Sequence, residues 1–179
     1  MVVSVSNTGL ATAIANGSAD VTATAGGICG SVSITVAQVG TMLTITSSPD
    51  TVRALGPAGV ASAQIVDANG NALPESTATT WSSSDTQVLA FSEGTAELEA
   101  LANGTAVLSA SIGNFNGTLD VVVAQSPASI VLTPTADTLR AVTESIQLTP
   151  TVVDANGFVV ASAAGVWSSS APGIASVST

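Results

Sequence analysis

The sequence has no histidine, no lysine and no tyrosine, and its only cationic side chains are Arg53 and Arg140. Without histidine or lysine, neither a Ser-His nor a Ser-Lys nucleophile can be built, and zinc lacks its nitrogen ligands. Twelve carboxylates against two arginines give a formal net charge of −10. Nucleic acids and anionic membrane surfaces are recognised through Lys and Arg. We therefore expect a protein that is not an enzyme and has no nucleic-acid partner.

Long apolar runs and cysteine pairs are also missing. No apolar segment approaches the roughly 20 residues needed to span a bilayer, so we expect no membrane insertion. The first residues lack the charged and apolar segments of a signal peptide, and we expect any export signal to lie outside this sequence. Cys29 is the only cysteine. A lone cysteine without a histidine has no activating base, so we expect an idle thiol in a turn, with an intermolecular disulfide as the alternative.

What the sequence does contain is a repeat with a spacing of 87 residues. We therefore predict three units: residues 1–38 are the C-terminal half of a repeat, residues 39–125 are a complete repeat, and residues 126–179 are the N-terminal half of another. The matching segments are 50–54 with 137–141, 66–70 with 153–157, 15–17 with 102–104, and 36–38 with 123–125.

Three interpretations of the two half-units are open. The chain can be a fragment of a longer array, because arrays normally need complete terminal units. Alternatively, the front half of one molecule completes the back half of the next, which gives a head-to-tail contact that never closes and hence a filament. In the third interpretation the halves fold together within one chain. The few residues at the junctions, Gln38 and Gln125, disfavour it because they leave little room for sharp turns.

Alternation of apolar and polar residues dominates the chain. Val32, Ile34 and Val36 face one way and the Ser and Thr residues between them face the other, which predicts a sheet buried on one side. About seven short strands per unit, with no helical pattern, predict an all-β fold of tandem immunoglobulin-like antiparallel β-sandwiches. Trp81 and Trp167 are the predicted large core residues of their units. Five Asn-Gly pairs predict tight turns, and they begin at Asn16, Asn69, Asn103, Asn116 and Asn156.

Three segments resemble one family. Residues 80–85 (TWSSSD), 9–17 (GLATAIANG) and 21–27 (VTATAGG) closely resemble the bacterial immunoglobulin-like modules of group 2. The turn at 67–71 resembles one found in the related invasin- and intimin-type modules. Members of this family occur in bacterial surface adhesins, as spacers in secreted enzymes, and in phage tail and capsid proteins. The resemblance implies a fold more than a function.

One turn is a candidate calcium site. Asp67, Asn69 and Asn71 have the alternate spacing that opens a calcium loop, and Glu75 is a possible further ligand. No glutamate stands at the twelfth position of this loop, and the matching turn carries Phe158 in place of Asn71. A hairpin turn accounts for the same residues.

Other polar residues have modest expected roles. Asn16, Asn103 and Asn116 begin Asn-Gly-Ser or Asn-Gly-Thr sequences, which are glycosylation acceptors where the machinery exists, although turn formation explains them as well. Glu97 and Glu99 replace residues typical of the family and point to one face of a strand. We expect a solvated acidic face there, since nothing forms the cleft that a pair of catalytic carboxylates needs.

The two arginines occupy the same place in two units. We expect each to pair with a carboxylate, such as Asp50 or Asp137, or with an acid of the next unit. A surface pair of this kind contributes only about 0 to 1 kcal/mol.

These observations predict a non-catalytic structural repeat that builds a stalk, fibre or surface array, extracellular or at the cell surface. Its expected partners are other copies of itself or neighbouring immunoglobulin-like repeats, because bare sheet edges accept further strands. No cofactor is expected apart from the calcium considered above. The alternatives are an adhesin that binds a host protein or glycan, and an accessory protein of a virion tail or capsid.

Overall fold

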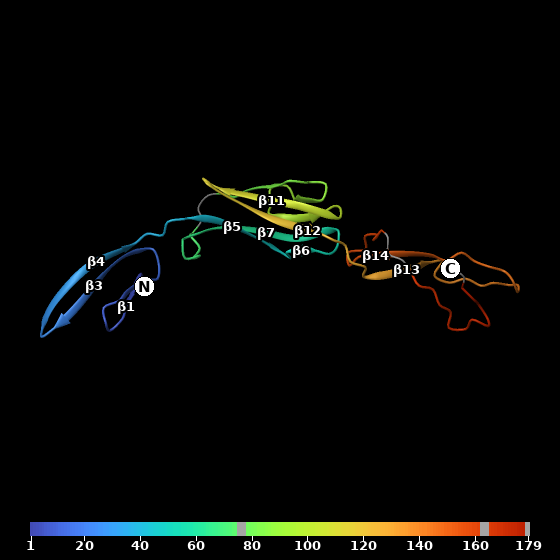
Figure 1. The fold of residues 1–179 in the computed structure, drawn as a ribbon, viewed down its shortest axis with the longest axis horizontal. Helices are drawn as coiled ribbons and strands as arrows, with labels where there is room; N and C mark the ends of the chain where they lie inside the picture. The colour runs from blue at the N-terminus through green and yellow to red at the C-terminus, as the bar shows by residue number, and fades with distance from the viewer. Residues whose placement is uncertain (75–77, 162–164, 178–179) are drawn as a thin grey trace.

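The computed structural model describes residues 1–74, 78–161 and 165–177. The described residues form fourteen strands and no helix, which confirms the predicted all-β fold. Three parts follow one another along an elongated molecule, with the N-terminal segment at one end and the C-terminal segment at the other (Figure 1).

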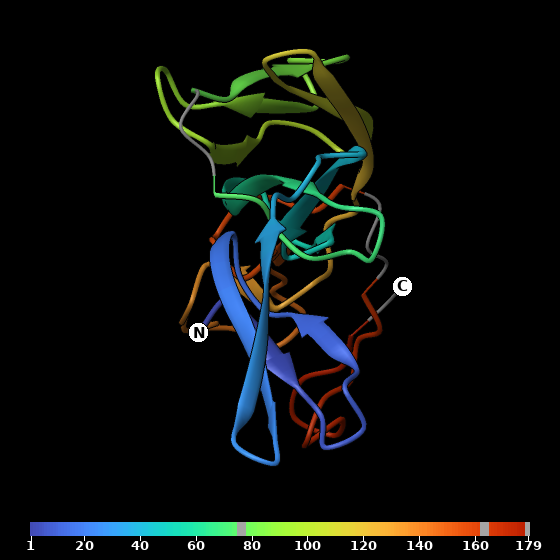
Figure 2. The same ribbon diagram turned by 90° about the vertical axis from the view of Figure 1, so that its left-hand side faces the viewer.

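The middle part is a sandwich of two four-stranded sheets, seen as separate layers in Figures 1 and 2. The first sheet has the order β5 (Met42–Ser48), β7 (Gly56–Val66), β10 (Glu97–Ala100), β9 (Leu89–Phe91), and the second β6 (Thr51–Val52), β12 (Phe115–Val123), β11 (Gly104–Ile112), β8 (Thr80–Ser83). When these strands are lettered in chain order, with β5 as A, β6 as A′ and β7 to β12 as B to G, the first sheet is A-B-E-D and the second is A′-G-F-C, which is the strand order of immunoglobulin-type sandwiches. Among these ladders only the β6–β12 pair is parallel.

The core of the middle part lies between these sheets. Leu108 and Val121 are fully buried, because alternate residues of β11 and β12 point inward. Half-buried Trp81 packs against both hydrophobic clusters of the core, and its ring lies 5.3 Å from that of Phe91. Trp167 is also half-buried.

Strand β10 separates apolar from acidic residues. Leu98 and Ala100 are buried in the core, while Glu97 and Glu99 are exposed on the opposite face. The acidic strand is therefore a solvated face, as the alternation predicts.

The flanking segments repeat parts of this sandwich with the same strand registers. In the N-terminal segment β1 (Val3–Val5) pairs with β2 (Ala11–Ala13), and β3 (Gly17–Ala25) pairs with β4 (Ile28–Val36). The β3–β4 ladder begins at Gly17↔Val36, as the β11–β12 ladder begins at Gly104↔Val123. In the C-terminal segment β13 (Ser129–Thr133) pairs with β14 (Thr149–Val153), in the register of β5 with β7.

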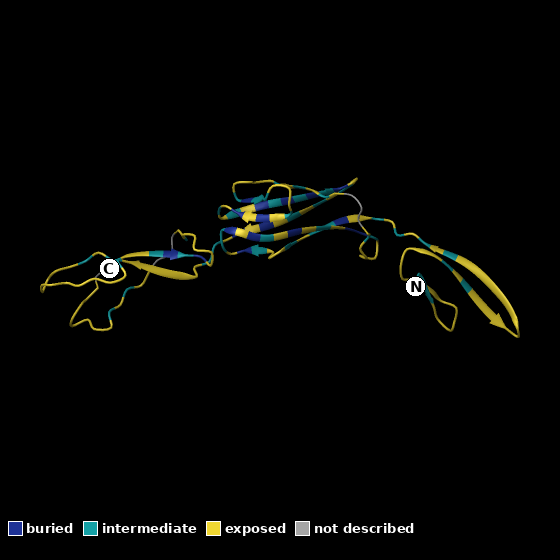
Figure 3. Ribbon diagram, turned by 180° about the vertical axis from the view of Figure 1, so that it is seen from behind, coloured by how far each residue is buried: buried dark blue, intermediate teal, exposed yellow. Residues whose placement is uncertain are grey.

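The N-terminal segment has counterparts of two strands from each sheet, and the C-terminal segment has counterparts of two strands from the first sheet, so the apolar faces of both segments lack a cover. Figure 3 shows buried residues concentrated in the middle part and exposed ones along both flanks. Ile130, the counterpart of buried Leu43, is 56 % exposed, and Leu139, the counterpart of buried Val52, is 43 % exposed. The strand structure is also shorter: residues 143–148 lie outside any strand, although their counterparts belong to β7. Their missing neighbour is a strand equivalent to β10.

Two predicted turns are wrong. Asn116 and Gly117 lie within β12, paired with Ser111 and Ala110, and the hairpin turn is instead Gly113–Asn114. Glycine occurs at position 117 for packing, since a Cβ there would lie 2.7 Å from Leu43 Cδ2. Likewise Cys29 is not in a turn, because it is paired with Thr24 inside the β3–β4 ladder.

Candidate functional site at the joints between units

Three side chains connect the first unit to the second. Asn16 Nδ2 donates to Gln38 Oε1 (2.9 Å), and the Gln38 backbone N–H donates to Asn16 Oδ1 (2.6 Å). Gln38 Nε2 then donates to Asp67 Oδ2 at 3.1 Å. The turn before β3, the linker and the turn after β7 are thereby joined through one glutamine.

The joint between the second and third units has the same three residue types in the same arrangement. Asn103 Nδ2 donates to Gln125 Oε1 (3.0 Å), and the Gln125 backbone N–H donates to Asn103 Oδ1 (2.7 Å). Gln125 Nε2 donates to Asp154 Oδ2 at 2.8 Å. We call each of these sets, Asn16–Gln38–Asp67 and Asn103–Gln125–Asp154, a joint bridge. Each joint bridge spans the same sequence separations of 22 and 29 residues.

The aspartate of each joint bridge also shapes its own turn. Asp67 Oδ1 accepts hydrogen bonds from the backbone N–H groups of Asn69 and Asn71, both at 2.9 Å. Asp154 Oδ1 accepts them from Asn156 and Phe158, both at 3.0 Å. One carboxylate therefore fixes the turn with one oxygen and holds the preceding unit's linker with the other.

The second joint has two further contacts, made by the loop between β6 and β7. The Leu55 N–H donates to Asp154 Oδ2 (2.9 Å), and Asn156 Nδ2 donates to the Leu55 carbonyl (2.6 Å). This loop covers the carboxylate, so Asp154 is only 2 % exposed whereas Asp67 is half-buried.

Gly56 makes this contact possible for two reasons. Its φ of +86° is a left-handed conformation that side chains other than glycine rarely adopt. A Cβ at Gly56 would also lie 3.1 Å from Phe158 Cε2, so the ring of the third unit packs directly on the loop of the second.

The hydrogen bonds favour the charged form of both aspartates. Donation from the Asn71 N–H and then from Gln38 Nε2 holds the pKa of Asp67 below its ordinary value of 3.8. For Asp154, burial raises the pKa, but donation by Gln125 Nε2 and by the Leu55 N–H outweighs it, so this pKa also lies below 3.8. Both joints therefore contain a carboxylate that is ionised at neutral pH.

The candidate calcium residues are the residues of this turn. Asp67 accepts four kinds of N–H donor, which accounts for the spacing of Asp67, Asn69 and Asn71 without a metal. Glu75 lies outside the described residues. Within the described ranges no three His, Cys, Asp or Glu side chains are grouped so that they could hold a metal ion. Calcium binding here stays a prediction, and the metal would have to replace N–H donors.

The candidate glycosylation residues have different surroundings. The carboxamides of Asn16 and Asn103 belong to the joint bridges, so a glycan on Nδ2 would displace the glutamine. Asn116 lies exposed on β12. Modification of the three stays a prediction.

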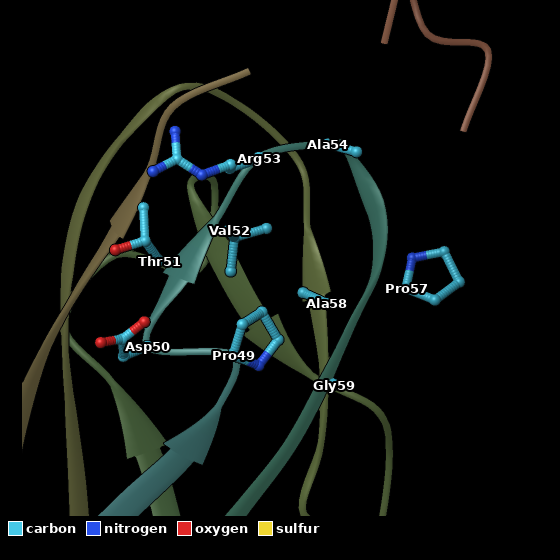
Figure 4. Close-up of a pocket in the computed structure, with 9 residues that line it drawn as sticks. All are labelled: Pro49, Asp50, Thr51, Val52, Arg53, Ala54, Pro57, Ala58 and Gly59. Atoms are coloured by element: carbon cyan, nitrogen blue, oxygen red, sulfur yellow. The ribbon is translucent and has the colours of Figure 1, made fainter. Parts of the chain in front are cut away.

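An open hollow with a volume of about 520 Å³ is lined by residues 49–54 and 57–59, beside the second joint. Figure 4 shows Asp50 and Arg53 at different ends of it. The expected ion pairs do not form among the described residues for either Arg53 or Arg140. A surface pair gains little beyond the side-chain entropy it costs, which explains why both arginines stay solvated.

Sequence reasoning missed the role of Gln38 and Gln125. Both follow a Val-Ala pair, and this recurrence marks the repeat without indicating a partner. Their partners lie 22 and 29 residues away and come close only through the fold.

No family model and no curated protein matches this sequence. Among solved structures, the chain is similar to domains 1–6 of the surface-layer protein SbsC, with 22 % identity and a TM-score of 0.41 over 89 % of this chain. It is also similar to domains 4–9 of the same protein, with 23 % identity and a TM-score of 0.42 over 89 % of this chain. The chain spans 22 % and 27 % of the lengths of these two structures.

In the described part of the chain, no helix is of a length and apolarity that would allow it to cross a membrane.

Proposed function

We propose that this chain is a non-catalytic structural repeat of bacterial immunoglobulin-like modules, and that it builds a stalk, fibre or array at the cell surface. The observation that carries the proposal is the recurrence of the joint bridge. The same three side chains connect consecutive units at both joints. A repeated, hydrogen-bonded joint fixes the relation between neighbouring units, which a spacer or array requires and a flexible linker does not provide.

The remaining surface fits this role. Acidic residues without lysine limit nonspecific association. The open hollow lined by residues 49–54 and 57–59 has no nucleophile with an activating base among its lining residues.

We further propose that the flanking segments complete each other between copies. The N-terminal segment supplies counterparts of β9, β10, β11 and β12, and the C-terminal segment supplies counterparts of β5 and β7. In the middle unit β7 pairs with β10, and β6 pairs with β12. The same pairings between two copies would join residues 143–147 to β2 and residues 138–139 to β4. These C-terminal residues are not in strands, which is consistent with their lacking these neighbours.

Small-angle X-ray scattering of dilute protein tests the joint. The wild-type chain is expected to give an elongated particle with a narrow distribution of interatomic distances. Gln38→Ala and Gln125→Ala are each expected to broaden that distribution, because the unit beyond the joint loses its orientation. Gln147→Ala removes an exposed glutamine whose side chain donates only to the neighbouring Leu148 carbonyl, and it serves as the matched control. A compact wild-type particle, or identical profiles for all four proteins, would contradict the proposal.

A further inference from the structure

The first joint lacks two contacts that the second joint has. In the second joint the loop 54–56 donates to Asp154 and accepts from Asn156. In the first joint Asp67 has no such loop, and among the described residues the Asn69 carboxamide has no hydrogen-bond partner. The turn at 67–71 therefore has the same acceptor, an aspartate Oδ2, and the same donor, an asparagine Nδ2, as the turn at 154–158. Within the described chain no counterpart of the loop 54–56 binds them.

The C-terminal segment contains a counterpart of the loop 54–56. Residues 141–143 are the counterparts of 54–56 in the repeat. Val142, the counterpart of Leu55, is 94 % exposed. Thr143 has a φ of +74°, close to the +86° of its counterpart Gly56, although a β-branched residue strongly disfavours this conformation.

Glu144 holds this loop in shape. Its Oε2 accepts hydrogen bonds from the backbone N–H groups of Arg140 (2.6 Å) and Ala141 (3.1 Å). The φ of Thr143 is therefore similar to that of Gly56, while Val142 is exposed and nothing in the described chain is docked on it. Backbone strain of this kind indicates a functional constraint, such as binding.

We propose that loop 140–143 of one copy docks on turn 67–71 of a second copy. The Val142 N–H donates to Asp67 Oδ2, and Asn69 Nδ2 donates to the Val142 carbonyl, as Leu55 does with Asp154 and Asn156. This inference rests on the proposed completion of the half-units between copies. When the C-terminal segment of one copy and the N-terminal segment of the next form a complete unit, this contact joins that unit to the middle unit of the second copy.

The side-chain sizes of this pairing match. Gly56 leaves room for Phe158, whose ring would clash with a Cβ at 3.1 Å. In the proposed contact the loop carries Thr143 in place of Gly56, and the turn carries Asn71 in place of Phe158. The added threonine side chain thus meets a smaller residue. The Asn71 carboxamide reaches back to Asp67 only through long hydrogen bonds of 3.3 and 3.4 Å, so this side chain can move at little cost.

The loop and the turn of a single copy cannot meet. In Figure 1 the turn that follows β7 lies at the end of the middle part beside the N-terminal segment, and the orange loop that follows β13 lies at the opposite end of the molecule. A second copy is therefore the occupant, and the contact continues head to tail.

A concentration series by sedimentation velocity tests the contact on the full chain. Asn69→Ala removes one donor from an exposed turn and is expected to weaken self-association about 2- to 10-fold, the range for one hydrogen bond. Asn156→Ala removes the equivalent donor from the contact within one chain, and is expected to leave the association constant unchanged. Equal association of the wild type and Asn69→Ala would overturn the inference, and so would equal weakening by both variants.

A covalent trap gives a second readout. On a Cys29→Ala background, the pair Asn69→Cys and Val142→Cys is expected to give a ladder of disulfide-linked oligomers under oxidising conditions, while either single substitution stops at dimers. A double variant that forms no oligomers beyond dimers would overturn the contact. A wild-type chain that stays monomeric at all concentrations would overturn both this contact and the completion of half-units, whereas the joint bridges are tested separately by the scattering of dilute monomers.

Discussion

Gln125 donates to Asp154 across the joint between the second and third units, with an Nε2–Oδ2 distance of 2.8 Å. The same glutamine binds Asn103 of the preceding unit through both its backbone and its side chain. One residue of the linker therefore touches both units. Since Gln38 does the same between Asn16 and Asp67, the linker is part of the structure and repeats with it.

Loss of this glutamine side chain is expected to open the joint locally without unfolding either unit. In Gln125→Ala, Asp154 keeps the Leu55 N–H as a donor but the linker is no longer held. We expect the Leu55 amide to exchange with deuterium about 10-fold faster than in the wild type, in line with the loss of one hydrogen bond to a charged group. Amides in the β11–β12 ladder are the internal control. Unchanged exchange at Leu55 would show that the glutamine does not hold the joint.

Both joints are expected to weaken in acid. The folded pKa values of Asp67 and Asp154 lie below the ordinary value of 3.8, so folding favours the charged carboxylates. Their contribution is therefore complete above about pH 5 and is lost as the pH falls through the folded pKa values. Scattering at about pH 6 and about pH 2.5 should show a narrow and then a broad distance distribution.

The matched control for this pH effect is Asp154→Asn, which cannot ionise. Its second joint is expected to be loosened already at about pH 6, and to change less than the wild type on acidification. Joints that are equally rigid at both pH values in the wild type would contradict the role of the charged aspartates.

Gly117→Ala is expected to destabilise the middle unit. Its Cβ would lie 2.7 Å from Leu43 Cδ2 and 2.9 Å from the Leu43 carbonyl oxygen, and such overpacking costs about 1 to 3 kcal/mol. Gly30 occupies the matching position of the N-terminal segment and has open space around it. Thermal unfolding should therefore show a lower melting temperature for Gly117→Ala and no change for Gly30→Ala. Equal melting temperatures would indicate that the sandwich relaxes around the new methyl group.

These two glycines illustrate what the sequence can and cannot predict. Alternation identified the inward faces of β11 and β12 correctly, because side-chain direction follows from the backbone alone. In the flanking β4 the same alternation leaves Val32 58 % exposed, because no second sheet covers it. The Asn116-Gly117 pair was interpreted as a turn, since Asn-Gly favours positive φ. At this position the glycine instead accommodates Leu43 of the opposite sheet, and contact between sheets leaves no local pattern.

The joint bridges show the same limit. The turn at Asp67 could be predicted from its own residues, because the aspartate binds N–H groups only two and four positions away. Its link to Gln38 could not, since the two are 29 residues apart and belong to different units. All of these residues recur in the repeat, but only the three-dimensional structure shows that they bind one another.

The proposed completion of half-units between copies predicts that charge is least tolerated at the exposed core positions of the flanks. Leu139 is 43 % exposed, and its counterpart Val52 lies in the core of the middle unit between the two sheets. Leu139→Asp would place a carboxylate in the core of the completed sandwich, where an unpaired charge is strongly disfavoured. We expect this variant to stay monomeric in sedimentation experiments at concentrations where the wild type associates, with the same unfolding temperature for the middle unit.

The control variant Val122→Asp puts the same charge on an outward-facing position of the middle unit and should associate like the wild type. If Leu139→Asp also associates normally, the flanking segments do not bury this face in one another, and the completed sandwich is not formed.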